Sequence, residues 1–162
     1  MPSPRPQPFY DGDHYDVTGS VGHQLWNLMT TMRREVDLRM TRVGLTDAQW
    51  RPLWILKTGS AHTANEIARQ LHIDAGAMTR LLDRLECKGL VERLRSESDR
   101  RVVQLRLTDA GEAAVAQVPH VLAGINNDVL AGFSETEWKQ LRKLLGRLHT
   151  NAAALTSGQA DE

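Results

Sequence analysis

The chain has 162 residues, of which 41% are hydrophobic and 25% are charged, and this is the composition of an ordinary soluble globular protein. Its 20 basic and 20 acidic residues cancel, so overall charge argues neither for nor against a nucleic-acid partner, and any electrostatic argument has to be local. A single cysteine excludes an intramolecular disulfide and fits a cytoplasmic protein, and no apolar run is long enough to predict a transmembrane helix.

The two ends of the chain differ from its middle. The first 16 residues contain four prolines, so residues 1–18 predict a flexible arm, and residues 157–162 predict a flexible tail. Residues 20–42 predict a helix that ends before Gly44. Its apolar arc is wide enough to predict burial on two sides. Two neighbouring stripes form this arc: Leu25, Leu28, Met32 and Val36 in one, and Trp26, Met29, Arg33 and Met40 in the other.

Three short helices are predicted next. Thr46 stands three residues before a Gln, and Thr63 three residues before a Glu, which is the spacing of a capping box. Asp74 is a suitable N-cap for the third helix, and Gly89 suits the left-handed position after its end. The buried face of this third helix is expected to consist of Met78, Leu81, Leu82 and Leu85.

The period then changes from helical to alternating. Residues 90–95 and 101–107 predict two short strands that form a hairpin. A helical pattern returns at residue 109, with irregularities at Pro119, Gly124 and Gly132. A last helix is expected from Ser134, which Glu137 caps. Its apolar stripe consists of Trp138, Leu141, Leu144, Leu145 and Leu148.

This order of four helices, two strands and two helices predicts a mainly α protein with a small β-hairpin wing, a winged helix-turn-helix fold. The first and last helices have apolar faces without a partner inside that module. We therefore expect them to pack together and against a second copy of the chain. The predicted domains are a dimerisation helix at 19–45, a DNA-binding winged helix-turn-helix at 46–108 and C-terminal dimerisation helices at 109–156.

Three segments resemble the MarR family of winged-helix transcription regulators. They are GLTDAQWRPL at 44–53, MTRLLDRLECKGLVERL at 78–94 and DRRVVQLRLTDAG at 99–111. The similarity extends over residues 20–155, and over 74–109 the chain is especially similar to the regulator after which the family is named. The resemblance implies a homodimer that binds a pseudo-palindromic site in double-stranded DNA, usually as a repressor that a small ligand or oxidation releases. We expect no enzymatic activity, no cofactor and no membrane partner.

The predicted recognition helix carries the first candidate DNA contacts. Arg80 and Arg84 share one face because they are four residues apart. In a major groove we expect Arg80 to contact guanine, while Thr79 and Arg84 hold phosphates. The helix begins with Gly76 and Ala77, which lack hydrogen-bonding side chains and so depart from the family pattern. The alternative is a solvated face on which the charged neighbours pair with these arginines: Asp83, Glu86 and Lys88.

The predicted wing carries the second set. Residues 69–106 contain nine Lys or Arg and six Asp or Glu, so the zero net charge conceals a locally basic segment. A hairpin tip is narrow enough for a minor groove, where arginine is favoured. We expect Arg101 to enter the groove, Asp99 to orient its guanidinium and Arg100 to contact a phosphate. The alternative is a solubilising turn with one surface ion pair.

An effector site is predicted from the tryptophans and their polar neighbours. Trp26 and Trp50 are more typical of a core than of a pocket, yet His23, Arg33 and Arg51 lie close to them in sequence. The family resemblance implies that an aromatic carboxylate or a phenol binds between the dimerisation helices and the winged helix. We therefore assign a small aromatic acid to these five residues.

Cys87 supports a competing hypothesis. It lies at the end of the recognition helix, at a position where lysine is common in the family, so a redox- or copper-responsive repressor is one alternative to the ligand-responsive one. An inert thiol is the simpler interpretation. The six histidines have no metal-ligand spacing, so no metal site is predicted. Two further alternatives are a small enzyme that uses Cys87 with a histidine and an architectural DNA-binding protein without an effector.

Overall fold

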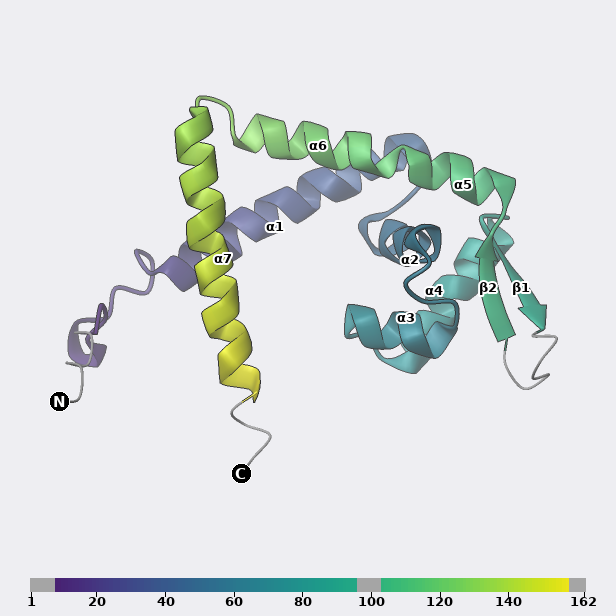
Figure 1. The fold of residues 1–162 in the computed structure, drawn as a ribbon, viewed down its shortest axis with the longest axis horizontal. Coiled ribbons are helices and arrows are strands. Elements are labelled where there is room, and N and C mark those ends of the chain that lie inside the picture. The colour runs from purple at the N-terminus through teal and green to yellow at the C-terminus, as the bar shows by residue number, and fades with distance from the viewer. Residues whose placement is uncertain (1–7, 96–102, 158–162) are drawn as a thin grey trace. The chain divides into compact units, whose positions relative to one another are not determined.

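The computed structural model describes residues 8–95 and 103–157, so Asp99, Arg100 and Arg101 lie outside the described residues. The described chain is mainly helical with one two-stranded antiparallel hairpin, which confirms the predicted fold class (Figure 1). It divides into two compact units, residues 1–121 and 122–162. Among the described residues no helix combines the length and apolar character that a membrane span requires.

Helix α1 (Val21–Met40) lies within the predicted range 20–42, and a 3-10 turn (Thr41–Val43) follows it. The Ser20 hydroxyl accepts a hydrogen bond from the His23 backbone N–H at 3.2 Å, and Gly44 follows the helix with a φ of 74°, a left-handed conformation that favours glycine. In the single chain the predicted burial is present only towards the end of α1, and burial of the rest stays a prediction for the dimer. Val36 and Met40 are buried, whereas Trp26 is 65% exposed and its apolar neighbours Leu28 and Met29 are about half exposed. The first half of α1 therefore presents apolar surface.

Three helices and the hairpin form the winged helix-turn-helix module, which lies in the first unit. Its helices are α2 (Asp47–Thr58), α3 (Ala64–Leu71) and α4 (Ala75–Cys87). The Gln49 side chain accepts a hydrogen bond from the Thr46 N–H at 3.2 Å, and Thr63 and Glu66 cap α3 reciprocally. The turn between α3 and α4 is short because His72 adopts a left-handed conformation with a φ of 52°.

The end of α4 has the predicted geometry. The N–H of Leu90 donates to the Leu85 carbonyl at 3.0 Å, and the N–H of Gly89 donates to the Glu86 carbonyl at 2.8 Å. With a φ of 68° at Gly89, these bonds make a Schellman motif. The inner face of α4 is buried as predicted, through Met78, Leu81, Leu82 and Leu85.

The hairpin pairs β1 (Val91–Arg95) with β2 (Val103–Leu107), and Val91 lies opposite Leu107. Val91, Leu105 and Leu107 are buried and so hold the hairpin against the module. The Leu105 N–H also donates to the His62 carbonyl at 2.7 Å, which ties β2 to the loop before α3.

The helical region after the wing is broken where one irregular helix was predicted. It consists of α5 (Asp109–Ala116) and α6 (Val118–Val129), and α7 (Glu135–Ser157) follows. Three helices therefore follow the hairpin, not two. Pro119 explains the break, because its missing N–H costs nothing in the first turn of a new helix. Ser134 and Glu137 cap each other at the start of α7, as predicted.

Gly111 holds α5 against the start of the wing. A Cβ atom at this position would lie 2.0 Å from the Leu90 carbonyl oxygen, a contact that only a backbone shift relieves. We expect Gly111→Ala to destabilise the fold by about 1–3 kcal/mol, the usual cost of overpacking. Gly22→Ala is the matched control, since a Cβ at Gly22 meets nothing within 4 Å. Urea denaturation checks both, and equal stability of the two variants would contradict the assignment.

Candidate nucleic-acid interface and effector groove

The outer face of α4 is available to a partner. Its inner face is buried, and Gly76, Thr79, Arg80 and Arg84 are exposed on the other side, with Ala77 half-buried between the two. The structure thus brings the predicted contacts of this helix onto one surface. Their side chains are positioned by a helix whose rotation is set by the core.

Asp74 organises the beginning of that surface. Its carboxylate accepts hydrogen bonds from the Ala77 N–H at 2.8 Å and the Gly76 N–H at 2.9 Å. These two bonds lower the pKa of Asp74, and the nearby Arg80 guanidinium contributes in the same direction. A Cβ at Gly76 would lie 3.3 Å from the Asp74 Oδ1 and 3.5 Å from the Arg80 Nη1. Glycine at position 76, where the sequence departs from the family pattern, therefore leaves room for the Asp74 cap and for the Arg80 side chain.

Thr79 is less available than the arginines. Its hydroxyl donates a hydrogen bond to the Ala75 carbonyl at 2.9 Å, within the same helix. A phosphate contact requires the hydroxyl to release this bond, because a phosphate oxygen needs a donor. The exposed arginines need no such change.

The acidic residues of α4 do not neutralise its arginines. Asp83 and Glu86 both pair with Arg93 of β1, at 2.7 and 2.9 Å. Among the described residues no salt bridge involves Arg80 or Arg84. The alternative in which Asp83 and Glu86 pair with these arginines is therefore wrong. The two carboxylates pair instead with Arg93 of the wing.

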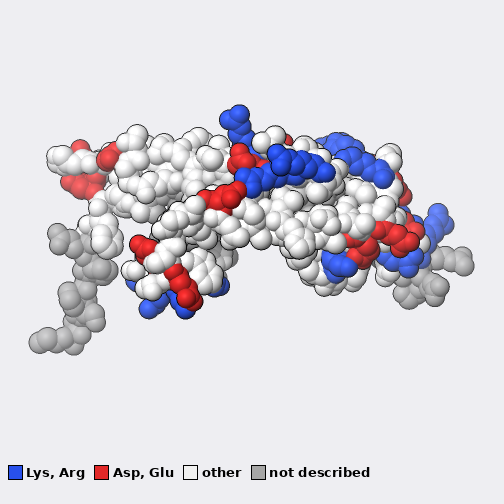
Figure 2. Space-filling model, turned by 90° about the horizontal axis from the view of Figure 1, so that it is seen from above, with Lys and Arg blue, Asp and Glu red and all other residues white. Residues whose placement is uncertain are grey.

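Positive charge is local in this protein. The face drawn in Figure 2 carries Lys and Arg beside Asp and Glu, with wide uncharged areas between them, and no surface of one sign extends across it. Four exposed arginines of the winged module have no salt bridge within the described part of the chain: Arg69, Arg80, Arg84 and Arg95.

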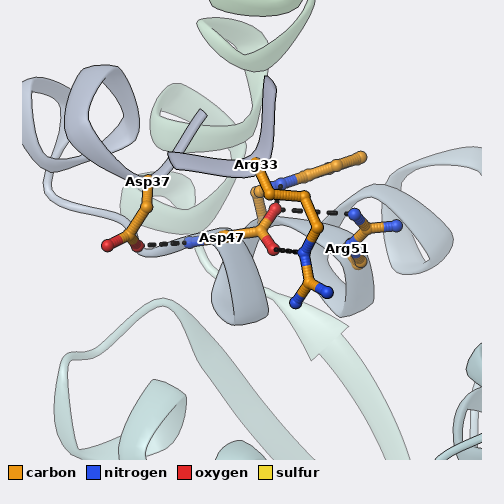
Figure 3. A network of polar contacts seen from close by, with 5 residues as sticks. Arg33, Asp37, Asp47 and Arg51 are labelled. Carbon is orange, nitrogen blue, oxygen red and sulfur yellow. Dashed lines mark hydrogen bonds and ion pairs between the residues drawn. The ribbon is translucent and has the colours of Figure 1, made fainter. Parts of the chain in front are cut away.

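Asp47 at the start of α2 gathers three of the predicted effector residues (Figure 3). Its Oδ1 accepts from the Trp50 indole Nε1 at 3.1 Å and from Arg51 at 3.5 Å, and its Oδ2 lies 3.5 Å from the Arg33 Nε. The Arg51 guanidinium also lies over the Trp50 ring, 4.8 Å from its centroid. Arg33, Trp50 and Arg51 thus meet, but they meet around a carboxylate.

A groove of about 480 Å³ lies beside this network, between α1 and the first turn of α2. It is lined by Thr30, Arg33, Arg34, Asp37, Thr46, Asp47 and Ala48. The Asp37 carboxylate closes the contact between the helices, because it accepts from the Asp47 N–H at 3.0 Å. Both carboxylates escaped the sequence analysis. Asp47 is in the first turn of α2, where the helix dipole already explains an acidic residue, and the contact of Asp37 spans ten residues.

The other two predicted effector residues lie elsewhere on α1. The rings of His23 and Trp26 are 6.1 Å apart, and neither residue lines the groove. Seven residues separate Trp26 from Arg33, which is about 10 Å along a helix. The structure therefore divides the predicted set into two groups.

Cys87 is a free, exposed thiol at the last residue of α4. Within residues 8–95 and 103–157, no three His, Cys, Asp or Glu side chains are grouped as metal ligands would be.

Comparison with known proteins finds one family and several solved structures that are similar to this chain. Residues 45–103 match the model of the MarR family. The reduced form of MarR from E. coli is 30% identical, with a TM-score of 0.71 over 80% of this chain and 96% of that one. YusO from Bacillus subtilis is also 30% identical, with a TM-score of 0.66 over 80% and 92% of the two chains. A cysteine-to-serine mutant of E. coli MarR, in complex with operator DNA, is 27% identical, with a TM-score of 0.70 over 83% and 99%.

Proposed function

This chain belongs to the MarR family and is a DNA-binding transcription regulator, not an enzyme, and from that premise we propose that it is a homodimeric repressor released by a small aromatic or phenolic acid. The exposed face of α4 carries the proposal. Arg80 and Arg84 point outward there without salt bridges to described residues, while Arg93 holds the acidic side chains of the same helix.

We assign the DNA contacts as follows. Helix α4 enters a major groove, where Arg80 makes bidentate hydrogen bonds to guanine and Arg84 contacts a phosphate. Gly76 and Ala77 let the start of the helix approach the backbone closely, and Thr79 contacts a phosphate once its hydroxyl turns. The mutant of E. coli MarR in complex with operator DNA supports DNA as the partner.

The wing contacts belong to the same proposal. Arg101 enters the minor groove with Asp99 orienting it, and Arg100 contacts a phosphate. Glu92 pairs with Arg106 across the two strands at 2.7 Å, which braces the hairpin behind its tip.

Exposed apolar side chains support the homodimer. On α7, Leu144, Leu145 and Leu148 are 40–45% exposed, and on α1 the side chain of Trp26 is 65% exposed. Exposed apolar stripes on two long helices usually mark a surface that another protein buries. A second copy buries this surface, and the two recognition helices then face successive turns of a pseudo-palindrome.

The groove beside Asp47 supports an anionic effector. Its volume is within the usual range for small-molecule sites, and Trp50 and two arginines are within reach. Because Asp47 already pairs with Arg33 and Arg51, a ligand carboxylate binds by taking the place of Asp47. Release of DNA requires that the ligand prefer a dimer whose recognition helices are wrongly spaced. A tenfold loss of DNA affinity needs about 1.4 kcal/mol of coupling.

The DNA contacts are tested with the sites that the protein selects from a random pool. We expect a two-fold pseudo-palindrome with half-sites about 34 Å apart. Arg80→Ala should cost about 1–3 kcal/mol and relax specificity at one base pair of each half-site. Binding titrations at several salt concentrations measure both, with Lys139→Ala on α7 as the control. Equal affinity for random DNA would favour an architectural protein instead.

The homodimer is tested on the last helix. Leu141→Glu together with Leu145→Glu places charge in the apolar stripe of α7, and we expect the double variant to lose the dimer and DNA binding. Analytical ultracentrifugation reports the mass, and Lys139→Gln with Lys143→Gln controls for the same change of two units in net charge on exposed positions of the helix. A soluble monomer that binds DNA like the wild type would refute the dimer.

The effector is tested with a panel of benzoates, salicylates and phenols. We expect tryptophan fluorescence and calorimetry to detect a submillimolar ligand whose affinity falls by the same factor when operator is present. Asp47→Ala should tighten binding, because it removes the competing carboxylate, whereas Arg33→Ala and Arg51→Ala should weaken it. If no member binds, or operator has no effect, the redox hypothesis at Cys87 becomes the stronger one, and peroxide treatment with a Cys87→Ser control tests it.

A further inference from the structure

The Lys88 side chain connects the end of α4 to the corner between α1 and α2. Lys88 is the C-cap residue of the recognition helix. Its Nζ donates to the Gly44 carbonyl at 3.0 Å and to the Gln49 Oε1 at 2.9 Å. One acceptor belongs to the loop after α1 and the other to the first turn of α2. A lysine at the end of a recognition helix would ordinarily be assigned to a phosphate, but this one is engaged within the protein.

Gln49 makes that connection specific. Its side chain is 5% exposed, and the same Oε1 also accepts from the Thr46 N–H at 3.2 Å. Two donors therefore converge on one buried oxygen, and one of them is charged. Charge-assisted hydrogen bonds are the stronger kind, and a buried acceptor that loses such a partner is costly to leave unsatisfied.

The same turn of α2 lines the groove. Thr46, Asp47 and Ala48 form part of the groove wall, and the next residue, Gln49, points inward to Lys88. On the groove side this turn is held by Asp37 and Arg33 of α1. Of these four consecutive residues, the first three line the groove and the fourth contacts the end of the recognition helix. A change in the partners of Asp47 reaches Lys88 through one turn of helix.

We propose that Lys88 is a positioning residue that, through Gln49 and Gly44, sets the orientation of α4 and transmits to it the state of the groove. This inference rests on the proposed DNA-binding function, but it makes a claim of its own: Lys88 contributes to specificity without touching DNA. A phosphate contact and a positioning contact differ in their dependence on salt.

Lys88→Met separates the two roles, because it keeps the aliphatic stem and removes the charge. We expect the ratio of operator to random-DNA affinity to fall about tenfold or more, with an unchanged slope of log affinity against log salt. A phosphate contact would instead flatten the slope by about 0.9 for each chain and weaken both DNAs alike. Arg84→Met on the same helix is the matched control and should show that flattening. Gln49→Glu keeps an acceptor for Lys88 and should retain specificity. A flattened slope for Lys88→Met, or an unchanged ratio, would overturn the proposal.

Transmission from the groove is measured without DNA. We expect Asp47→Ala to speed amide hydrogen exchange in residues 84–90, the last turn of α4 and the cap that follows it, and to have no such effect when Lys88 is already Met. Independent effects of the two substitutions would show that Lys88 transmits nothing. Thermal melts establish that each variant is folded. If the wild type selects no DNA sequence, the proposed function fails while this exchange experiment still decides the role of Lys88.

Discussion

The rotation of α4 about its own axis is the constraint on which the DNA-binding surface depends. Met78, Leu82 and Leu85 are fully buried, and burial of each such side chain contributes about 1.5–3 kcal/mol. Rotating the helix would expose them, so the core decides which residues face outward. Arg80 and Arg84 therefore reach the surface because their neighbours at positions 78, 82 and 85 are apolar. The Asp74 cap and the Schellman motif at Gly89 then fix where the helix begins and ends.

Charge is distributed by the same logic. The chain is neutral overall, and the recognition helix contains acidic residues within one turn of its arginines. Left in place, Asp83 and Glu86 would reduce the field at Arg80 and Arg84. Arg93 lies on β1, where the hairpin packs beside α4, and it pairs with both carboxylates. The wing thereby neutralises the acidic side of the helix and leaves the arginine side unscreened. A neutral protein can thus present a locally basic surface to a polyanion.

Local signals in the sequence predicted the local structure well. Caps at Thr63, Asp74 and Ser134, the turn at Gly89 and the apolar face of α4 depend on residues within five positions of one another, and all are present. The break at Gln117 was missed because the proline was interpreted as a kink within a helix, when it also fits the first turn of a new one.

Contacts between segments that are distant in the sequence could not be predicted from the periodicity of apolar residues. Lys88 and Gln49 are on different helices and 39 residues apart, and Asp37 meets the backbone of Asp47 across a tight corner. Neither pair leaves a pattern in the sequence, since each residue is also explained by its own helix. The predicted effector residues fall into two groups for the same reason. Proximity in sequence grouped His23 and Trp26 with Arg33, although the helix places them about two to three turns away.

The corner between α1 and α2 connects these observations. It holds the end of α1 through Asp37 and Arg33, and it holds the end of α4 through Gln49 and the Gly44 carbonyl. In a dimer built on α1, the spacing of the two recognition helices is set by how each module is attached to that helix. Polar bonds at this attachment are well placed to alter the spacing. A small rotation of the module about the attachment moves the distant recognition helix by a larger distance. Asp47 makes such bonds, and its carboxylate lies 3.5 Å from each of its two arginine partners, Arg33 and Arg51. One turn of α2 therefore borders the groove through Asp47 and contacts the end of α4 through Gln49.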